Sequence, residues 1–225
     1  MSRSARLAVP LSVPPTVPEH EPDLVSDHKE AIIQALRWAW SELATLDPHL
    51  LRTGNEESIS EKLQNLLNER CDGTRRVRWL TDFETVTRSE NQRTADGRIQ
   101  KKPDLTFRPP AYPYPSVINT TRWGWFVECK IINGSTSVTA YRDEGVHRFA
   151  VGEYAAWMPS GAMLAYVRDG SMPSQRLPQA LLGHSETRQH RPGPTPDRSE
   201  SEHDRSCLAN PCVDVVLSHL WLTVP

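Results

Sequence analysis

The sequence predicts a three-layer α/β or α+β domain with a mixed β-sheet of about five strands flanked by helices. Three observations lead to this fold class. Two stretches with apolar residues at helical spacing come first, at residues 26–46 and 56–70. A near-continuous apolar run of strand length follows at residues 123–132. Beyond it, helical patterns again alternate with strand-like segments, as expected for one layered domain.

The two N-terminal helices have recognisable ends. Residues 26–46 stop before Pro48, which cannot continue a helix, and Ser26 or Asp27 can serve as the N-cap. Residues 56–70 repeat the apolar periodicity. We therefore expect two consecutive helices before the first strand.

Strand signals begin after these helices. β-branched and aromatic residues start at Val77, and an Asp-Gly turn leads into residues 99–109, which together predict a hairpin. The apolar run at 123–132 is typical of a central strand buried on both faces. The remaining expected elements are a helix at 138–158, a strand at 161–168, a short helix at 175–184 and a closing strand at 213–224.

Proline content sets the expected domain limits. The 19 prolines concentrate at residues 9–22 and 173–196, and proline disfavours regular helices and central strands. We expect residues 1–25 to form a flexible Pro-rich arm and residues 26–225 to form a single domain. Within that domain, residues 184–206 are polar and nearly free of apolar side chains, which predicts a disordered insertion.

Composition and motifs exclude several protein classes. The formal net charge of -2 excludes a strongly basic, histone-like protein, although residues 70–108 are locally basic. Neither a membrane-spanning apolar run nor a signal peptide is present, so we expect a soluble, cytoplasmic protein. The chain also lacks the G-x-S-x-G, H-E-x-x-H, P-loop and G-x-G-x-x-G motifs. Serine-hydrolase and ATP-driven activities therefore have no support in the sequence.

Two charged residues interrupt the most hydrophobic run of the chain. Side chains alternate across a strand, so Glu128 and Lys130 point to one face, and their neighbours point to the other. Burying a charge costs several kcal/mol unless it is paired or binds a metal. Asp104, in the preceding strand-like segment, can face Glu128 from a neighbouring strand. Two carboxylates and a lysine are thus expected to converge.

This cluster suits a hard divalent cation. Magnesium prefers oxygen ligands and is commonly held by one or two carboxylates together with waters and a substrate phosphate, and manganese can substitute for it. The lysine can orient or deprotonate a water and stabilise charge that develops on a phosphate. The residues therefore point to hydrolysis of a phosphodiester.

At these positions the chain resembles the PD-(D/E)xK nuclease superfamily, which has the restriction-endonuclease-like fold. The resemblance rests on Pro103-Asp104 followed by Glu128-Cys129-Lys130 on the next strand, and it covers about residues 55–168. It implies that Asp104, Glu128 and Lys130 are catalytic. It also implies that Asp104, Glu128 and the backbone carbonyl of Cys129 hold Mg²⁺.

In that superfamily a helix ahead of the hairpin often supplies a further acidic residue. Glu57 is the best match here, as a catalytic residue and metal ligand, and Glu56 and Glu61 are the alternatives.

Tyr141, Arg148 and Lys102 are candidates for binding nucleic acid. Tyr141 and Arg148 are spaced, with Glu144, to share one face of the helix that follows the motif strand, from which Arg148 could reach the scissile phosphate. The alternative for Arg148 is a surface ion pair with Glu144. Lys102, beside the motif aspartate, completes the set.

The resemblance implies a Mg²⁺-dependent nuclease, with DNA expected ahead of RNA and internal cleavage ahead of cleavage from an end. Prokaryotic antiviral defence and DNA processing are both compatible with it, and a homodimer or a partner protein is one way to bind the target. Two alternatives stay open. One is a catalytically silent nuclease-fold protein that binds nucleic acid, and the other is an assembly subunit in which the Glu128-Lys130 pair is structural.

Overall fold

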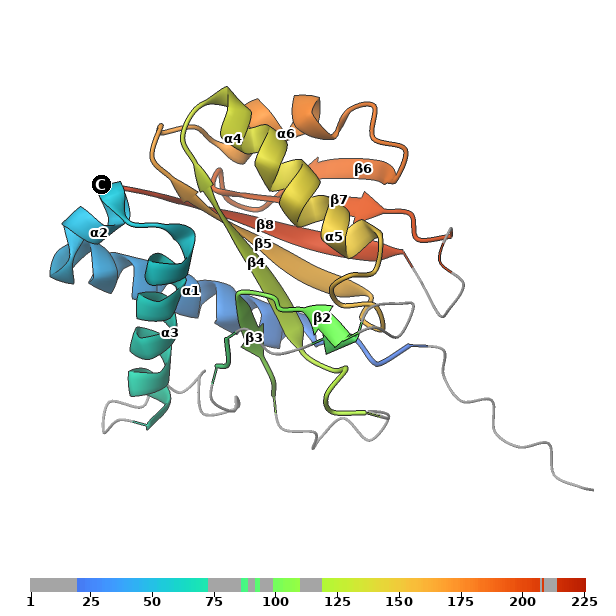
Figure 1. Cartoon of the computed structure of the whole chain (residues 1–225), viewed down its shortest axis with the longest axis horizontal. Helices are drawn as coiled ribbons and strands as arrows, with labels where there is room; N and C mark the ends of the chain where they lie inside the picture. The colour runs from blue at the N-terminus through green and yellow to red at the C-terminus, as the bar shows by residue number, and fades with distance from the viewer. Residues whose placement is uncertain are drawn as a thin grey trace, which may run out of the picture.

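A six-stranded mixed sheet forms the centre of the molecule (Figure 1). A computed structural model describes residues 20–72, 86–88, 92–93, 99–109, 119–206, 208 and 214–225. The strands of the sheet are β3 (Leu105–Phe107), β4 (Trp125–Ile132), β5 (Ser160–Val167), β6 (Thr187–Pro192), β7 (Arg198–His203) and β8 (Val215–Thr223). A separate antiparallel pair consists of β1 (Gln92–Arg93) and β2 (Ile99–Lys101).

The strand order is β3-β4-β5-β8-β7-β6. The central strands β4, β5 and β8 run parallel, and β3, β7 and β6 add to the two sides by antiparallel pairing. This confirms the mixed α/β architecture predicted from the sequence, with six strands in the sheet where about five were expected.

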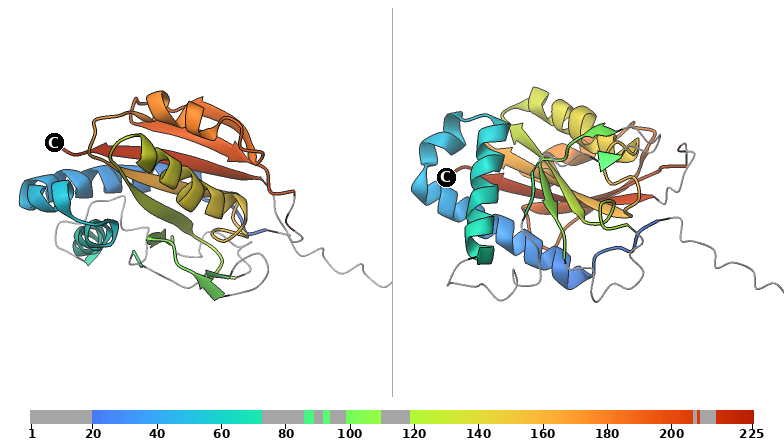
Figure 2. Two further views of the ribbon diagram at one scale, coloured as in Figure 1. Left: turned by 45° about the horizontal axis from the view of Figure 1, so that its top comes forward. Right: turned by 60° about the horizontal axis from the view of Figure 1, so that its bottom comes forward.

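Helices cover both faces of the sheet (Figures 1 and 2). One layer contains α1 (Ser26–Leu46), α2 (Pro48–Thr53) and α3 (Glu56–Asp72). The other contains α4 (Ser135–Ala140), the π-helix η1 (Tyr141–Val146), α5 (His147–Ala150) and α6 (Pro173–Leu181). Among the described helices, none combines the length and apolarity needed to cross a membrane.

Alternate residues of β5 face opposite helical layers. On one face, Trp40 of α1 stacks on Tyr166, with ring centroids 5.4 Å apart, and donates its indole N–H to the Thr223 carbonyl at 2.9 Å. On the other face, Gly161 allows Phe149 of α5 to lie so close that a Cβ at Gly161 would clash with its ring. Both faces of the central sheet are therefore core, which explains the continuous apolar texture of β4 and β5.

The helix α1 spans the predicted residues 26–46, although its N-cap is Val25 and not Ser26 or Asp27, and α3 begins where it was expected. The short helix α2 was not predicted. Its cause is local, because the Asp47 side chain accepts the Leu50 N–H at 2.9 Å and Pro48 occupies the first helical turn. Asp47 and Pro48, which end α1, therefore also begin α2.

The helix expected at 138–158 is shorter and less regular than predicted. It begins at Ser135, passes through η1 and ends at Ala150, and turns occupy residues 151–157. Ala155 within this loop has a φ of 48°, which a helix cannot accommodate.

The prediction of a disordered insertion at residues 184–206 is wrong. These residues contain β6 and β7, which form an antiparallel hairpin that continues the sheet from β8. The strand β7 does bury alternate residues, but Ser199, Ser201 and His203 are the buried ones. For Ser201 and His203, hydrogen bonds take the place of the apolar contacts on which the prediction depended.

The expected N-terminal arm is partly ordered. Residues 1–19 lie outside the described residues, but residues 20–25 pack onto the domain. The backbone N–H of Glu21 donates to the Trp157 carbonyl at 2.9 Å, and Leu24 is buried. The domain therefore begins before residue 26.

A chain of buried polar groups connects η1 to β7 and β8. The Tyr141 hydroxyl is 2.8 Å from His219 Nδ1, and the Ser201 hydroxyl is 2.7 Å from His219 Nε2 and 2.6 Å from His203 Nε2. The chain continues from His203 Nδ1 to the Thr187 hydroxyl at 3.3 Å. Each imidazole has hydroxyl partners on both ring nitrogens, which suits the neutral form, in which one nitrogen donates and the other accepts.

We expect this network to make folding sensitive to acid. Burial lowers the pKa of His203 to about 4 from 6.5, and the nearby charges of Arg205 and His184 add to this, although Glu186 opposes it. Stability from the neutral imidazole is therefore complete above pH 6.5 and is lost as the pH falls through about 4. The difference corresponds to about 3 kcal/mol of unfolding free energy.

Denaturant titrations of wild type and His203→Gln between pH 7.5 and 4 measure this effect. The wild-type free energy of unfolding should fall by about 3 kcal/mol more than that of the variant over this range. His49→Gln, at an exposed position on α2, is the matched control and should follow the wild type. Parallel pH curves for wild type and His203→Gln would contradict the expectation.

Candidate active site

The candidate site lies where β3 and β4 separate. The two strands pair from Phe107↔Trp125 to Leu105↔Val127, and the register ends there. Asp104 immediately precedes β3, and its Oδ2 accepts the backbone N–H of Cys129 at 2.7 Å. The carboxylate therefore occupies the position on the β4 edge that a strand partner would otherwise take. Because the N–H and C=O of one strand residue point to the same edge, the Cys129 carbonyl is directed to this side as well.

Glu128 and Lys130 both lie on β4, next to Asp104. The Lys130 ammonium is 3.1 Å from Glu128 Oε1, and Glu128 is almost fully buried. Glu128 is in register with Met163 of β5, whose methyl group lies against Gly145 of η1. The pair therefore faces the α4–α5 layer.

The first residue of α3 completes the acidic side of the site. Glu56 Oε2 is 3.4 Å from the Lys130 ammonium, and this oxygen is buried without a hydrogen bond. Glu57, the best match from the sequence, has an 82% exposed side chain and lies 3.9 Å from Arg88. Glu61 is exposed on the next turn. Of the three glutamates considered, Glu56 is the one in contact with the Glu128-Lys130 pair.

Arg148 of α5 reaches the same carboxylate from the opposite side. Its Nη1 is 3.1 Å from Glu128 Oε1 and 2.9 Å from the Tyr154 hydroxyl. That hydroxyl donates to the Lys102 carbonyl at 3.4 Å. Arg148 therefore contacts Glu128 rather than Glu144, the surface partner that the sequence left open.

These groups surround an open cavity of about 260 Å³. It is lined by acidic and basic residues and one tyrosine: Glu56, Glu57, Arg88, Lys102, Asp104, Glu128, Lys130, Arg148 and Tyr154. Lys102 is exposed at its rim. The cavity thus combines buried carboxylates with several cationic side chains.

Burial shifts the pKa of each acidic group that meets Lys130. It raises the pKa of Glu128 to about 8, an effect increased by the charge of Asp104 and opposed by Lys130 and Arg148. Burial also raises the pKa of Asp104 and of Glu56. Burial alone would lower the pKa of Lys130, but the Glu128 and Glu56 charges outweigh it and raise that pKa. Lys130 is accordingly a cation held among carboxylates.

Tyr141 is not part of this site. It is fully buried and its hydroxyl contacts His219, so the sequence-based prediction that it binds nucleic acid is wrong. The prediction assumed that residues seven apart lie on one α-helical face. Tyr141 is the first residue of the π-helix η1, and the wider turn of η1 rotates its side chain away from that of Arg148.

The donor set fits a magnesium-like cation in number and kind. Asp104 and Glu128 line one cavity, the Cys129 carbonyl is directed to the strand edge that Asp104 contacts, and a buried Glu56 oxygen lies beside Lys130. Across the described ranges, no group of three or more His, Cys, Asp or Glu side chains is arranged to hold a metal ion. Magnesium does not need such a cage, because waters and substrate phosphate complete its shell.

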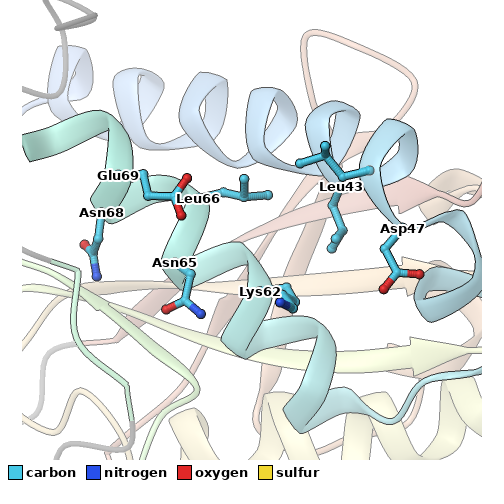
Figure 3. Close-up of a pocket in the computed structure, with 8 residues that line it drawn as sticks. Leu43, Asp47, Lys62, Asn65, Leu66, Asn68 and Glu69 are labelled. Carbon is cyan, nitrogen blue, oxygen red and sulfur yellow. The ribbon is translucent and has the colours of Figure 1, made fainter. Parts of the chain in front are cut away.

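A second cavity lies between α1 and α3 (Figure 3). Its volume is about 650 Å³, and it is lined by Leu43, Leu46, Asp47, Lys62, Asn65, Leu66, Asn68 and Glu69. Its lining consists of leucines, asparagines and the charged residues Asp47, Lys62 and Glu69, and it does not bring two carboxylates together. The arrangement offers no hydrolytic chemistry comparable to that of the first cavity.

Sequence reasoning missed Arg88 and Tyr154. Tyr154 lies in the turn after α5, within a stretch that the sequence assigned to a helix. Arg88 lies in a three-residue described segment, with no motif residue beside it in the sequence. An excess of basic residues at 70–108 was the only available signal for Arg88.

The chain matches no protein-family model, no curated protein and no solved structure.

Proposed function

We propose that the chain is a Mg²⁺-dependent nuclease that hydrolyses internal phosphodiester bonds of DNA. One observation carries the proposal: Asp104, Glu128 and Lys130 meet in one cavity at the point where β3 and β4 separate. Their sequence spacing resembles the PD-(D/E)xK nucleases, and the mixed sheet between two helical layers is compatible with the fold of that superfamily.

Asp104, Glu128 and the Cys129 carbonyl would hold the cation, and Glu56 replaces Glu57 as the supporting acid. Bound there, Mg²⁺ or Mn²⁺ would act as a Lewis acid toward the scissile phosphate. A cation would also neutralise carboxylates whose raised pKa values reflect the cost of keeping them charged when buried.

Lys130 supplies positive charge beside the reacting phosphate. Its ammonium is fixed by Glu128 at 3.1 Å and Glu56 at 3.4 Å, so it is positioned before substrate arrives. It has three N–H donors, and one that is not used on Glu128 can hold the attacking water. A fixed cation of this kind stabilises charge that develops in the transition state without reorganisation.

Arg148, Tyr154 and Lys102 form the opposite wall. The Tyr154 hydroxyl bridges the Arg148 guanidinium and the Lys102 carbonyl, which limits how far Arg148 can move. Arg148 has further N–H donors in a planar fork that suits a phosphate. We assign it, with exposed Lys102, to contacts with the DNA backbone.

One observation favours an alternative. Lys130 and Arg148 both contact Glu128 Oε1, so the buried carboxylate already has two cationic partners. A purely structural network in a binding or assembly subunit would have the same geometry. Such a network would gain no stability from a divalent cation, whereas a metal site is stabilised by mass action.

The test is cleavage of plasmid, linear duplex, single-stranded DNA and RNA in Mg²⁺ or Mn²⁺, with Lys130→Met beside the wild type. We expect metal-dependent nicking of plasmid by the wild type and a loss of at least about 100-fold in the variant. The matched control is Lys62→Met, at an exposed lysine of α3 that lines the second cavity and not the candidate site. Absence of both cleavage and a metal-linked rise in Tm in the wild type would favour the structural alternative.

A further inference from the structure

Arg88 is held in the cavity by a rigid backbone. The Thr87 and Thr106 backbones exchange hydrogen bonds of 3.2 and 2.9 Å, which joins this segment to β3. The Asn68 side chain of α3 accepts the Val86 N–H at 2.8 Å and donates to the Val86 carbonyl at 3.0 Å. The segment that carries Arg88 is therefore fixed to both a strand and a helix.

The guanidinium of Arg88 is poorly satisfied for a group with so little exposure. Its side chain is 16% exposed, and its Nε is buried without a hydrogen-bond partner. Among the described residues, its ion-pair partner is Glu57 at 3.9 Å, which is beyond hydrogen-bond length and is itself 82% exposed. A buried guanidinium ordinarily uses its N–H groups on carboxylates or carbonyls, because leaving them unpaired costs free energy.

The other cations of the cavity are engaged differently. Lys130 and Arg148 both contact Glu128, whereas Lys102 is exposed at the rim. Arg88 lines the same cavity, and its neighbour Thr87 pairs with Thr106, two residues after Asp104. Arg88 therefore presents unused donors beside the carboxylates proposed to take part in cleavage.

We infer that Arg88 binds a phosphate of the substrate strand, on the α3 side of the cavity and opposite Arg148. A planar guanidinium can bind two phosphate oxygens at once, and the N–H donors of Arg88 are not used on Glu57, which lies 3.9 Å away. The inference rests on the proposed nuclease function, because the phosphate bound by Arg88 is taken to belong to the same DNA strand as the phosphate that is cleaved. It deepens that function by assigning a backbone contact on each side of the reacting carboxylates.

Binding of a fluorescent DNA duplex in Ca²⁺, followed by anisotropy over a range of salt concentrations, tests the inference. We expect Arg88→Ala to raise the Kd by about 10- to 100-fold and to reduce the salt dependence by about one ion. Arg88→Lys keeps the positive charge but loses the planar guanidinium, so its Kd should lie between those of Arg88→Ala and wild type. Arg191→Ala, at an exposed site on the distant strand β6, should leave the Kd unchanged.

A second measurement separates this inference from the nuclease proposal. Inorganic phosphate in EDTA should raise the Tm of wild type and of Arg191→Ala, and it should not raise the Tm of Arg88→Ala. If wild type cuts DNA and Arg88→Ala matches it in Kd and in the phosphate effect, the inference is wrong and the nuclease stands. If the phosphate effect requires Arg88 but wild type cuts nothing, the anion site stands and the nuclease proposal fails. The Tm of Arg88→Lys without phosphate shows whether a change at Arg88 merely disturbs the fold.

Discussion

Asp104→Asn is expected to lower the rate of DNA cleavage by at least about 10³-fold without weakening the fold. The neutral amide loses the negative charge that would hold the cation. Its Oδ1 can still accept the Cys129 N–H, which Asp104 accepts at 2.7 Å, so the β3–β4 junction should keep its geometry. The measurements are plasmid nicking in Mg²⁺ and the Tm of the same preparation in EDTA.

The Tm is expected to stay the same or to rise by about 3 °C. Burial raises the pKa of Asp104, so the folded state favours the neutral carboxyl. Stability from that preference is present below the unfolded pKa of 3.8 and is lost as the pH rises through the folded value. At neutral pH the raised pKa of Asp104 therefore destabilises the metal-free fold, and asparagine removes this cost.

Glu144→Gln is the matched control, because Glu144 is an exposed acid on η1. It should retain wild-type cleavage and Tm. Wild-type cleavage by Asp104→Asn would show that this carboxylate holds no catalytic metal. A large fall in its Tm in EDTA would instead assign Asp104 a structural role at the start of β3.

The centre of this site was predictable from the sequence because a strand has a simple period. Alternation placed Glu128 and Lys130 on one face, and the apolar run around them predicted burial. The structure bears out both local expectations, with Glu128 3% exposed and the two side chains in contact. The identity of the helical acid was not predictable to the residue. Consecutive side chains on a helix point about 100° apart, and the entry angle of α3 favours Glu56 over Glu57.

Polar burial explains why β6 and β7 could not be predicted. Pattern analysis equates buried positions with apolar residues, but β7 directs Ser201 and His203 inward. These side chains are satisfied by each other and by His219 on β8, a partner 18 residues away from Ser201. Hydrogen bonds between distant residues leave no periodic trace in a single sequence.

The second large effect is expected at Arg205, a fully buried residue just beyond β7. Its guanidinium donates to the backbone carbonyls of Phe149, Tyr154, Ala155 and Met158, at 2.9, 3.3, 3.0 and 3.2 Å respectively. We expect Arg205→Ala to lower the free energy of unfolding by about 4 kcal/mol, because buried carbonyls lose their partners. In a chain of this size the Tm should fall by about 10 °C.

The Tm of Arg205→Lys should lie between those of Arg205→Ala and wild type, because one ammonium cannot donate to all four carbonyls that the guanidinium reaches. Arg188→Ala, at an exposed arginine on β6, is the control and should leave the Tm within about 2 °C. Thermal unfolding of the three variants in one buffer measures these effects. A Tm for Arg205→Ala close to that of Arg188→Ala would contradict the assignment.

Arg205 also links the β6–β7 hairpin to the candidate site. The loop that it holds includes Ala155, whose φ of 48° is unfavourable for a non-glycine residue and persists only when surrounding contacts enforce it. The same loop presents Tyr154, whose hydroxyl fixes Arg148 at 2.9 Å. If Arg205→Ala remains folded at 25 °C, cleavage should therefore fall further than the folded fraction does. A cleavage rate that follows only the folded fraction would show that the loop keeps its shape without Arg205.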